Sequence, residues 1–397
     1  MTKPANEFNH YIKIFENYVA SFELLLEELS KSKKNVSKYL ISDLKNAIEW
    51  IFKLVTIYQS DTYRAPWPKT YETAMFGITF SKTQPAQGTI EWLEQRKNRI
   101  SASDIGSALD ENEYKESDIV IIEKCGYPDH WWFDESSFVF THHGHKYEFV
   151  ASQIHEVKYK VKCNEAGFIP HPTIDFIGAS PDKFVIDDIN HRGYLVEIKC
   201  PYRRYPKPNI VPRYYWIQMQ IQLEVTGLDE CYFEDCRILE YSSEAEYLED
   251  TDMVCPKKGV IGAVQDLVAN TIHYIYPVLH NPETDNGSEN ERYLRMKNEI
   301  DISVNELKQK SEKYYFKGYS WWRLEKHESI LVLRDRKWFA EVFPKLQAFW
   351  QKILYHRAHG YDELLKKYNK PTVAELLAKP KVQNTDSTKM LNDMLCF

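Results

Sequence analysis

Hydrophobic and polar residues alternate in the middle of the chain with the two-residue period of β-strands. Residues 173–179 and 193–200 are β-rich runs, and a polar turn lies between them. In the second run the alternation puts Glu197 and Lys199 on one side of a largely apolar strand. A buried acid and amine need a partner, and a divalent cation is an effective one. Asp182, in the turn after Ser-Pro, adds a second carboxylate, whereas a plain Glu–Lys ion pair is the alternative.

Helical spacing predicts elements on both sides of these strands. We expect helices over 8–30, 36–58, 91–96, 119–124, 216–225, 260–280, 291–316, 336–355 and 361–378, and a further strand over 231–237. Gly227 would end the helix over 216–225. These elements predict three regions: a helical N-terminal extension with a linker (1–88), a mixed α/β core (89–240) and a mostly helical C-terminal region (241–397).

Composition and charge exclude several classes of protein. The chain has 397 residues, 43% of them hydrophobic, which is enough for a substantial core. Because the net charge is −7, a nucleic acid would have to bind in a local basic groove. The seven cysteines include no CxxC pair and favour a reducing, intracellular compartment. We expect neither a membrane span nor a signal peptide.

Two stretches before the central strands carry candidate chemistry. Ser101 or Ser103 could cap a helix, and with Arg96 nearby that helix start would suit a phosphate; a simple cap and a surface arginine are the alternative. Glu148 follows three histidines at positions 142–145, which we expect in a loop, and lies in the first turns of the next helix. Zinc is disfavoured there because His155 and Cys163 complete no recognisable ligand spacing.

Basic and aromatic residues are interleaved after the second strand. Cations suit phosphates and rings suit bases, although an ordinary surface loop has the same composition. The basic residues are Arg203, Arg204, Lys207 and Arg213. In the following helix Gln218 and Gln222 share a face, and Gln220 points elsewhere.

Together these motifs resemble the lambda-phage-type alkaline exonucleases, or YqaJ-like viral recombinases, of the PD-(D/E)xK nuclease superfamily. The resemblance spans roughly residues 91–237. Its motifs in chain order are Arg96 with Ser101-Ala102-Ser103, Gly144-x-x-x-Glu148, Ser180-Pro181-Asp182, Glu197-Ile198-Lys199 and Gln218-Met219-Gln220. The fold it implies is a central mixed sheet flanked by helices, a restriction-endonuclease-like core.

The resemblance also implies roles for these residues. Magnesium or manganese, as two ions, would be held by Glu148, Asp182, Glu197 and the Ile198 carbonyl, with Lys199 orienting or deprotonating the attacking water. Gln218 and Gln220 would line the site, although helical geometry leaves open whether both can. Arg96, Ser101 and Ser103 would receive a 5′-terminal phosphate.

The function implied is 5′-to-3′ digestion of double-stranded DNA ends, leaving 3′ overhangs for recombination. A single-strand annealing protein would be the partner, and related exonucleases form trimers. A viral source, acting in host cytoplasm or nucleus, fits the family. Alternatives are a structure-selective endonuclease, a catalytically weak DNA-binding recombination scaffold, and a Cas4-like iron–sulfur nuclease. The last is disfavoured because Cys231, Cys236, Cys255 and Cys396 are poorly spaced for a cluster.

Overall fold

The computed structural model describes residues 84–85, 87–127, 135–187, 192–279, 285–372 and 374–375. The helices expected over 8–30 and 36–58, and nearly all of the linker, lie outside these ranges. Among the described helices, none combines the length and the apolar character needed to cross a membrane.

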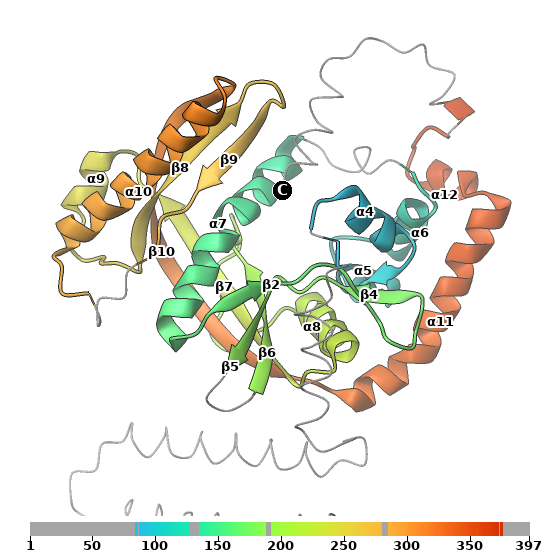
Figure 1. Ribbon diagram of the computed structural model, residues 1–397. Helices are drawn as coiled ribbons and strands as arrows, with labels where there is room; N and C mark the ends of the chain where they lie inside the picture. Colours follow the sequence, from blue (N-terminus) through green and yellow to red (C-terminus); the bar gives the residue numbers. More distant parts are fainter. Residues whose placement is uncertain are drawn as a thin grey trace, which may run out of the picture. The chain divides into compact units, whose positions relative to one another are not determined.

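The described chain is built on a seven-stranded mixed sheet (Figure 1). Its strand order is β2-β5-β6-β7-β10-β8-β9, and only β6 and β7 run parallel. The strands are β2 (Cys163–Glu165), β5 (Lys183–Asp187), β6 (Arg192–Lys199), β7 (Glu230–Glu240), β8 (Lys258–Asp266), β9 (Thr271–Ile275) and β10 (Tyr314–Leu333). The mixed α/β fold predicted from the sequence is therefore confirmed.

A second, smaller sheet has three strands, in the order β1-β4-β3. β1 (Ile100–Ser101) runs parallel to β4 (Ile177–Ala179), which pairs antiparallel with β3 (Ile169–Pro170). This pairing is the reason that two segments distant in sequence meet: the Ser101-Ala102-Ser103 motif begins at the last residue of β1, and the Ser180-Pro181-Asp182 motif follows β4.

One face of the large sheet is covered by the helices α5 (Ala102–Ala108), α6 (Ser117–Lys124), α8 (Arg213–Thr226) and α11 (Arg336–His359). Helix α11 contributes apolar residues at helical spacing, among them Val342, Leu346 and Phe349. Leu195 and Phe233 face this core from the strands. Two short helices flank these elements in the chain: α4 (Ile90–Lys97) precedes α5, and α12 (Asp362–Lys367) follows α11.

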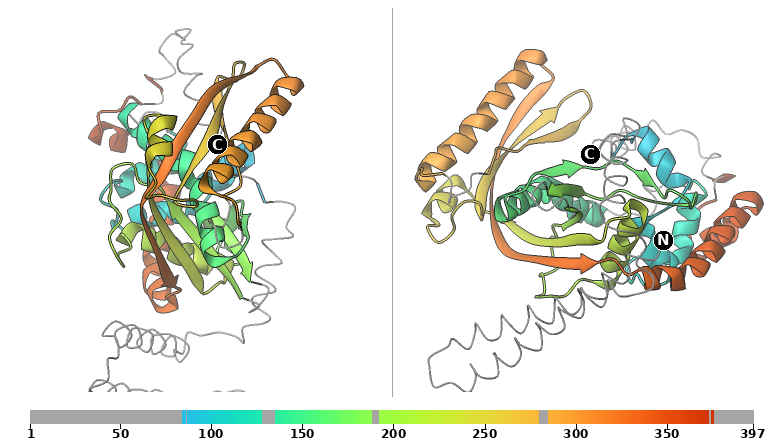
Figure 2. Two further views of the ribbon diagram at one scale, coloured as in Figure 1. Left: turned by 90° about the vertical axis from the view of Figure 1, so that its left-hand side faces the viewer. Right: turned by 60° about the horizontal axis from the view of Figure 1, so that its bottom comes forward.

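The opposite face is covered by α7 (Glu135–Tyr159) and α10 (Glu289–Lys310). Val196 and Ile198 of β6 point into this second core, opposite in direction to Leu195, as the strand period requires. Figures 1 and 2 show α10 beside β8, whereas α11 passes α6 and α8 at the other end. The site is therefore bounded by α7 on one face of the sheet and α8 on the other.

Strand β10 joins the two halves of the sheet. Its residues 314–323 pair with β8, and its residues 322–333 pair with β7. The register shifts between Phe316 and Gly318, and Gly318 adopts φ 132°, a conformation that residues with a Cβ rarely take. The helix expected over 260–280 is wrong, because β8, a turn and β9 occupy it. The helix expected over 291–316 ends at Lys310, before β10 begins.

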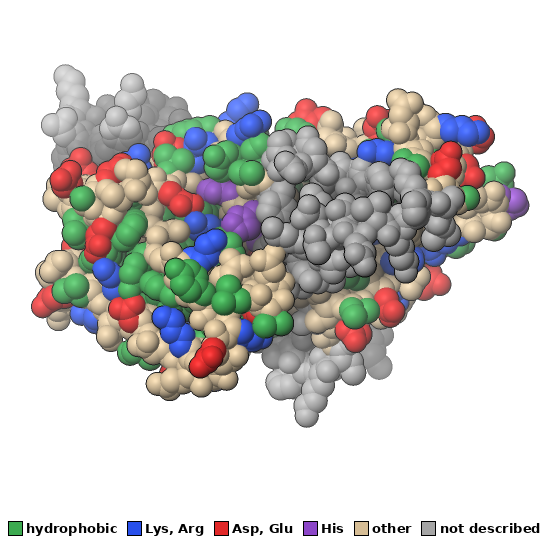
Figure 3. All heavy atoms as spheres, turned by 90° about the horizontal axis from the view of Figure 1, so that it is seen from above, with side chains coloured by type: hydrophobic (Ala, Val, Ile, Leu, Met, Phe, Trp, Pro, Cys, Tyr) green, Lys and Arg blue, Asp and Glu red, His purple; other side chains and the backbone are tan. Residues whose placement is uncertain are grey.

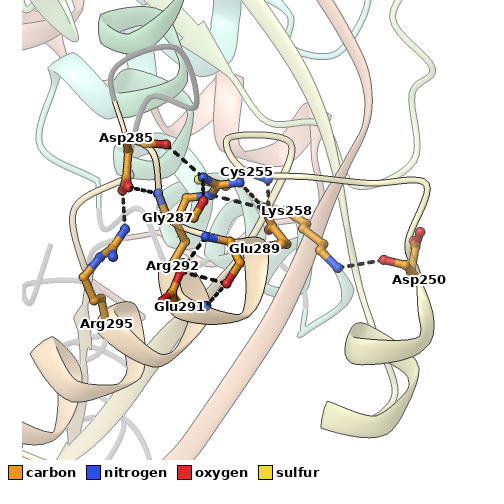
Figure 4. Close-up of polar contacts among 10 residues, drawn as sticks. Asp250, Cys255, Lys258, Asp285, Gly287, Glu289, Glu291, Arg292 and Arg295 are labelled. Carbon is orange, nitrogen blue, oxygen red and sulfur yellow. Dashed lines mark hydrogen bonds and ion pairs between the residues drawn. The ribbon is translucent and has the colours of Figure 1, made fainter.

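Polar contacts fix the start of α10 (Figure 4). Ser288 and Glu291 form a reciprocal capping box, and Arg292 donates to the Asp285 carbonyl and, with a further short contact, to Gly287. Nearby, Lys258 of β8 donates to the carbonyls of Tyr247 and Asp250 at 3.0 and 2.7 Å. These bonds also hold α9 (Glu244–Glu249) and attach the C-terminal elements to one another.

Helix α7 begins earlier than expected. The histidines at positions 142–145, predicted to lie in a loop, are inside the helix, and Glu148 sits near its middle rather than in its first turns. Helix α7 also runs through Gly144. The helix is held there by contacts such as that between Lys146 and Glu240 of β7 at 2.9 Å. Packing on the sheet outweighs the low helix propensity of the glycine.

Candidate active site

Glu197 and Lys199 lie side by side on β6, facing α8. Glu197 is fully buried, and its carboxylate contacts the Lys199 ammonium directly. Burial alone would lower the pKa of Lys199, but the charges of Glu197 and Asp182 outweigh it and hold that pKa well above its usual range. The acid–amine pair expected from the strand alternation is therefore present, with the acid buried and the amine partly exposed.

Asp182 joins this pair from the turn between β4 and β5. Its Oδ2 accepts a 2.7 Å hydrogen bond from the peptide N–H of Ile198 and lies 3.7 Å from Lys199 Nζ. The turn that follows β4 thus brings the Ser-Pro-Asp motif against the end of β6. Asp182, Glu197 and Lys199 form one cluster, although Asp182 precedes Glu197 by 15 positions in the sequence.

Glu148 approaches the cluster from α7. Burial, and then the charge of Asp182, raise the pKa of Glu148 to about 8. The same two causes raise the pKa of Glu197 to about 7. The three carboxylates thus lie close enough for their negative charges to oppose one another.

This set of oxygen donors fits a hard divalent cation. Carboxylate oxygens are the ligands that magnesium and manganese prefer, and a cation would relieve the repulsion among them. Glu148, Asp182 and Glu197 are the residues that would hold such an ion. The Ile198 carbonyl is the fourth expected ligand. The peptide N–H of Ile198 already donates to Asp182.

Two glutamines of α8 hold the Glu197 carboxylate. Gln218 donates to Oε1 and Gln222 donates to Oε2, each at 2.6 Å. The expectation that Gln220 lines the site is wrong. Its amide donates to the Leu333 carbonyl at 2.8 Å and accepts from the Asp335 N–H at 2.6 Å. Residues two apart on a helix face different directions, so only the pair at i and i+4 reaches Glu197.

The predicted phosphate motif also comes together. Arg96 donates to Ser103 Oγ at 3.0 Å, and Ser103 Oγ lies 3.2 Å from Ser101 Oγ. Ser101 precedes α5 but does not cap it with its side chain, because its hydroxyl donates to Asp104. Trp92, stacked under Arg96, donates to Ser180 Oγ at 2.9 Å. Ser180 is two residues before Asp182, so this motif lies next to the carboxylate cluster.

A buried ion-pair network supports the Ser101–Ser103 turn. Asp104 is 2.8 Å from Lys124 Nζ and 3.3 Å from Lys115 Nζ. These lysine charges, together with that of Arg96, outweigh burial and hold the pKa of Asp104 well below its usual range. Asp104, paired with the two lysines, therefore holds the Ser101–Ser103 turn in place. Arg96 keeps its exposed contact with Ser103.

The four basic residues after β6 have different environments. Arg204 forms two bonds, at 2.5 and 2.7 Å, with Asp235, which is 1% exposed. Arg203 and Lys207 are exposed, and Arg203 stacks on Phe140 of α7. Arg213 pairs with Glu111 at 2.7 Å on the surface. Arg204 is thus a structural residue, whereas the other three present charge to solvent.

His145 and Gln222 are site residues that the sequence motifs missed. His145 Nδ1 lies 3.9 Å from Glu148 Oε2, one turn earlier on α7. The face drawn in Figure 3 shows histidine side chains gathered beside Lys and Arg side chains. Helical spacing was the available signal in both cases: His145 is at i−3 from Glu148, and Gln222 is at i+4 from Gln218.

Comparisons with known proteins bear on this arrangement. Residues 91–229 match the family model of the YqaJ-like viral recombinase domain. An uncharacterized protein of Acanthamoeba polyphaga mimivirus is 31% identical over 317 residues, 70% of this chain and 55% of that protein. The chain thus spans about half the length of this curated relative.

Solved structures of low sequence identity are also similar. An alkaline exonuclease from Laribacter hongkongensis is 18% identical, with 70% of this chain and 99% of that chain covered and a TM-score of 0.37. A phage-related exonuclease from Haemophilus somnus is 12% identical, with coverage of 68% and 96% and a TM-score of 0.34. The family match covers the Arg96, Glu148, Asp182, Glu197 and Gln218 motifs in their predicted order. The site motifs thus lie within the segment that matches the YqaJ-like viral recombinase domain.

Proposed function

We propose that the protein is a metal-dependent deoxyribonuclease that digests double-stranded DNA from 5′ ends and leaves 3′ overhangs for recombination. The observation that carries the proposal is the convergence of three acids from separate elements beside one lysine. Glu148 comes from α7, Asp182 from the turn after β4, and Glu197 from β6 with Lys199. The match of residues 91–229 to the YqaJ-like viral recombinase domain supports it.

The residues of this chain would divide the work of phosphodiester hydrolysis. The acids hold magnesium or manganese, and Gln218 and Gln222 fix the Glu197 carboxylate for that task. When bound, a pair of such ions lowers the pKa of water and stabilises the leaving oxygen. Lys199, as an ammonium between Asp182 and Glu197, orients the attacking water rather than removing its proton.

Arg96, Ser101 and Ser103 supply the preference for an end. A guanidinium and two hydroxyls beside a helix start suit a phosphate, and Trp92 ties this group to Ser180 next to the acids. A bound 5′-phosphate would set the first phosphodiester bond at the acids. Arg203, Lys207 and Arg213 would contact the DNA backbone.

The wider setting follows from the same proposal. A 3′ overhang is a substrate for a single-strand annealing protein, which we propose as a partner. A ring of copies, such as a trimer, would keep the enzyme on its DNA between cleavage steps. The mimivirus relative supports a virus-encoded protein, and we propose that it acts in host cytoplasm or nucleus.

The direct test is digestion of linear duplex DNA in magnesium, with each strand labelled in turn. The intact protein should shorten the 5′-phosphorylated strand from its 5′ end and should spare the 3′ ends. Lys199→Ala should be inactive. Equal digestion by both proteins would rule out this site. Nicking of covalently closed circles would instead assign a structure-selective endonuclease. Normal DNA binding without cleavage would assign a recombination scaffold.

A further inference from the structure

We propose that Glu234, Cys236 and His327 bind a transition-metal ion of the zinc class, at a site separate from the catalytic carboxylates. Glu234 and Cys236 lie on β7, and His327 lies on the neighbouring strand β10. One ligand atom from each lies within 4.8 Å of the other two. The inference does not depend on the proposed nuclease activity.

The sheet register brings the three residues together. Cys236 is directly opposite His327 in the antiparallel pairing of β7 and β10, and Glu234 is opposite Ser329. Glu234 and Cys236 are two residues apart and so point to the same face of the sheet. Side chains of opposed and diagonal residues in such a pair are within reach of one another. The cluster therefore follows from the backbone pairing as well as from the side-chain positions.

The donor set and its burial suit zinc. A cysteine sulfur, a histidine nitrogen and a carboxylate oxygen are the three ligand types that zinc uses in proteins. Glu234 and Cys236 are fully buried, and the His327 side chain is 15% exposed. A water molecule at the exposed side of His327 would complete a four-coordinate site. Magnesium would be a poor fit, because it avoids sulfur and nitrogen.

An ion would replace the contact of one Glu234 oxygen with His327 and would leave the partners of the other oxygen in place. Glu234 Oε1 lies 2.7 Å from His155 Nδ1 and accepts a 2.5 Å hydrogen bond from Ser329. Its Oε2 faces His327 Nε2 in a short contact. Hydrogen bonds to the non-ligating atom of a carboxylate are typical of the outer shell of a metal site, where they orient the ligand.

Those outer residues are themselves anchored. His155 Nε2 lies 3.2 Å from the Tyr194 hydroxyl, and Tyr159 lies 2.8 Å from Ser329 Oγ. The site thus joins α7, β6, β7 and β10. An ion there would tie the long strand β10, which carries the C-terminal elements, to the strand beside the catalytic residues.

The site is distinct from the carboxylate cluster. Cys236 packs in the core on the α7 and α10 face, whereas Cys231, on the same strand, packs in the opposite core. Glu197 faces α8 on the side of Cys231. Removing a catalytic acid should therefore leave a metal at Cys236 in place, which allows the two metal sites to be tested separately.

The test is metal analysis of the untagged full-length protein after gel filtration, because a histidine tag would itself bind zinc. We expect about one zinc per chain in the native protein, in Asp182→Asn and in the matched buried-cysteine control Cys231→Ala. Cys236→Ala and His327→Gln should retain less than about one tenth of it. A substoichiometric zinc content in the native protein, or equal zinc in Cys236→Ala, would overturn the proposal.

Cobalt supplies a second readout that does not require the variants to fold. Zinc-depleted native protein with one equivalent of cobalt should develop the near-ultraviolet charge-transfer band of a cobalt–thiolate bond. Magnesium in excess should not remove the band. If cobalt gives no thiolate band, the cluster is a hydrogen-bonded network without an ion, and the proposal fails.

Discussion

Gln222 donates from its side-chain amide to Glu197 Oε2 at 2.6 Å, one helical turn after Gln218, which donates to Oε1 at the same distance. Both oxygens of a fully buried carboxylate are therefore held by amides of one helix face. Lys199 contacts Oε1 as well, so the acid is fixed in direction before any cation arrives. Gln222 would consequently position Glu197 in the proposed metal site.

Gln222→Leu should weaken magnesium binding by about 10- to 100-fold, the usual effect of losing an outer partner of a metal ligand. The substitution leaves Oε2 without its donor and frees the carboxylate to turn. Magnesium titration of DNA cleavage, at saturating DNA, measures the change. Gln220→Leu is the matched control: it lies on the same helix, but its amide bonds Leu333 and Asp335. A control that lost magnesium affinity equally would show that both substitutions act by loosening α8.

Stability without metal should fall as pH rises. Burial and the charge of Asp182 raise the pKa of Glu148 to about 8 and that of Glu197 to about 7, from an ordinary 4.5. The folded state therefore binds more protons than the unfolded state above pH 4.5. The stability linked to these protons is fully present below pH 4.5 and is lost as pH rises to about 8, by about 1.4 kcal/mol per pH unit for each proton.

Thermal unfolding in a chelator, from pH 5 to pH 8, measures this dependence. Magnesium binds the ionised acids, so its stabilising effect should grow over the same range. Glu148→Gln should flatten the slope measured in chelator, and the exposed substitution Glu94→Gln should not. A metal-free protein whose stability increases from pH 5 to pH 8 would contradict the shared burial of these acids.

Local patterns predicted the parts of the site that lie on single elements. The alternation in 193–200 placed Glu197 and Lys199 on one face, and Gly227 marked the end of α8 with φ 75°. Helical spacing identified α4, α6, α8 and α11 to within a few residues at most ends. These features depend on residues close in sequence, and that is the information a periodic pattern carries.

Features that depend on pairing across the sheet were harder to predict. Residues 260–280 are apolar because β8 and β9 are covered by α10, and a buried strand and a buried helix have the same composition. β10 was missed because its long, mixed pattern follows two partners in turn. The cluster at Glu234 depends on the register of β7 with β10, which no single-element pattern contains.

Arg96→Ala should remove the preference for 5′-phosphorylated ends. Arg96 donates to Ser103 at 3.0 Å, and the buried acid near it, Asp104, already pairs with Lys124 and Lys115, so the Arg96 charge is available to a phosphate. A charge-assisted hydrogen bond contributes about 1.5–3 kcal/mol, which corresponds to about 10- to 100-fold. The measurement is the ratio of digestion rates for duplexes with a 5′-phosphate and with a 5′-hydroxyl.

Lys97→Ala is the control for Arg96, because Lys97 is exposed at the end of the same helix. The control should keep the native ratio. If Arg96→Ala also keeps it, while slowing both substrates alike, Arg96 acts on the fold or on general DNA binding. The phosphate would then bind elsewhere.

Arg203 and Arg204 are adjacent in sequence, but we expect opposite effects of their removal. Arg203 and Lys207 are exposed, so the double variant Arg203→Ala with Lys207→Ala should weaken DNA binding and reduce the slope of log affinity against log salt by about 2. Its thermal stability should stay close to native. Arg204→Ala leaves Asp235 buried without a partner and should cost about 3–5 kcal/mol of stability.

The two effects are separated by fluorescence anisotropy of labelled duplex at several salt concentrations and by denaturant unfolding of the same proteins. Adding Asp235→Asn to Arg204→Ala should recover part of the lost stability, because the uncompensated buried charge is then removed. An unchanged salt slope in the Arg203 and Lys207 variant would make the segment after β6 an ordinary surface loop. A reduced slope, with stability intact, would make it a path for the DNA backbone beside Lys199.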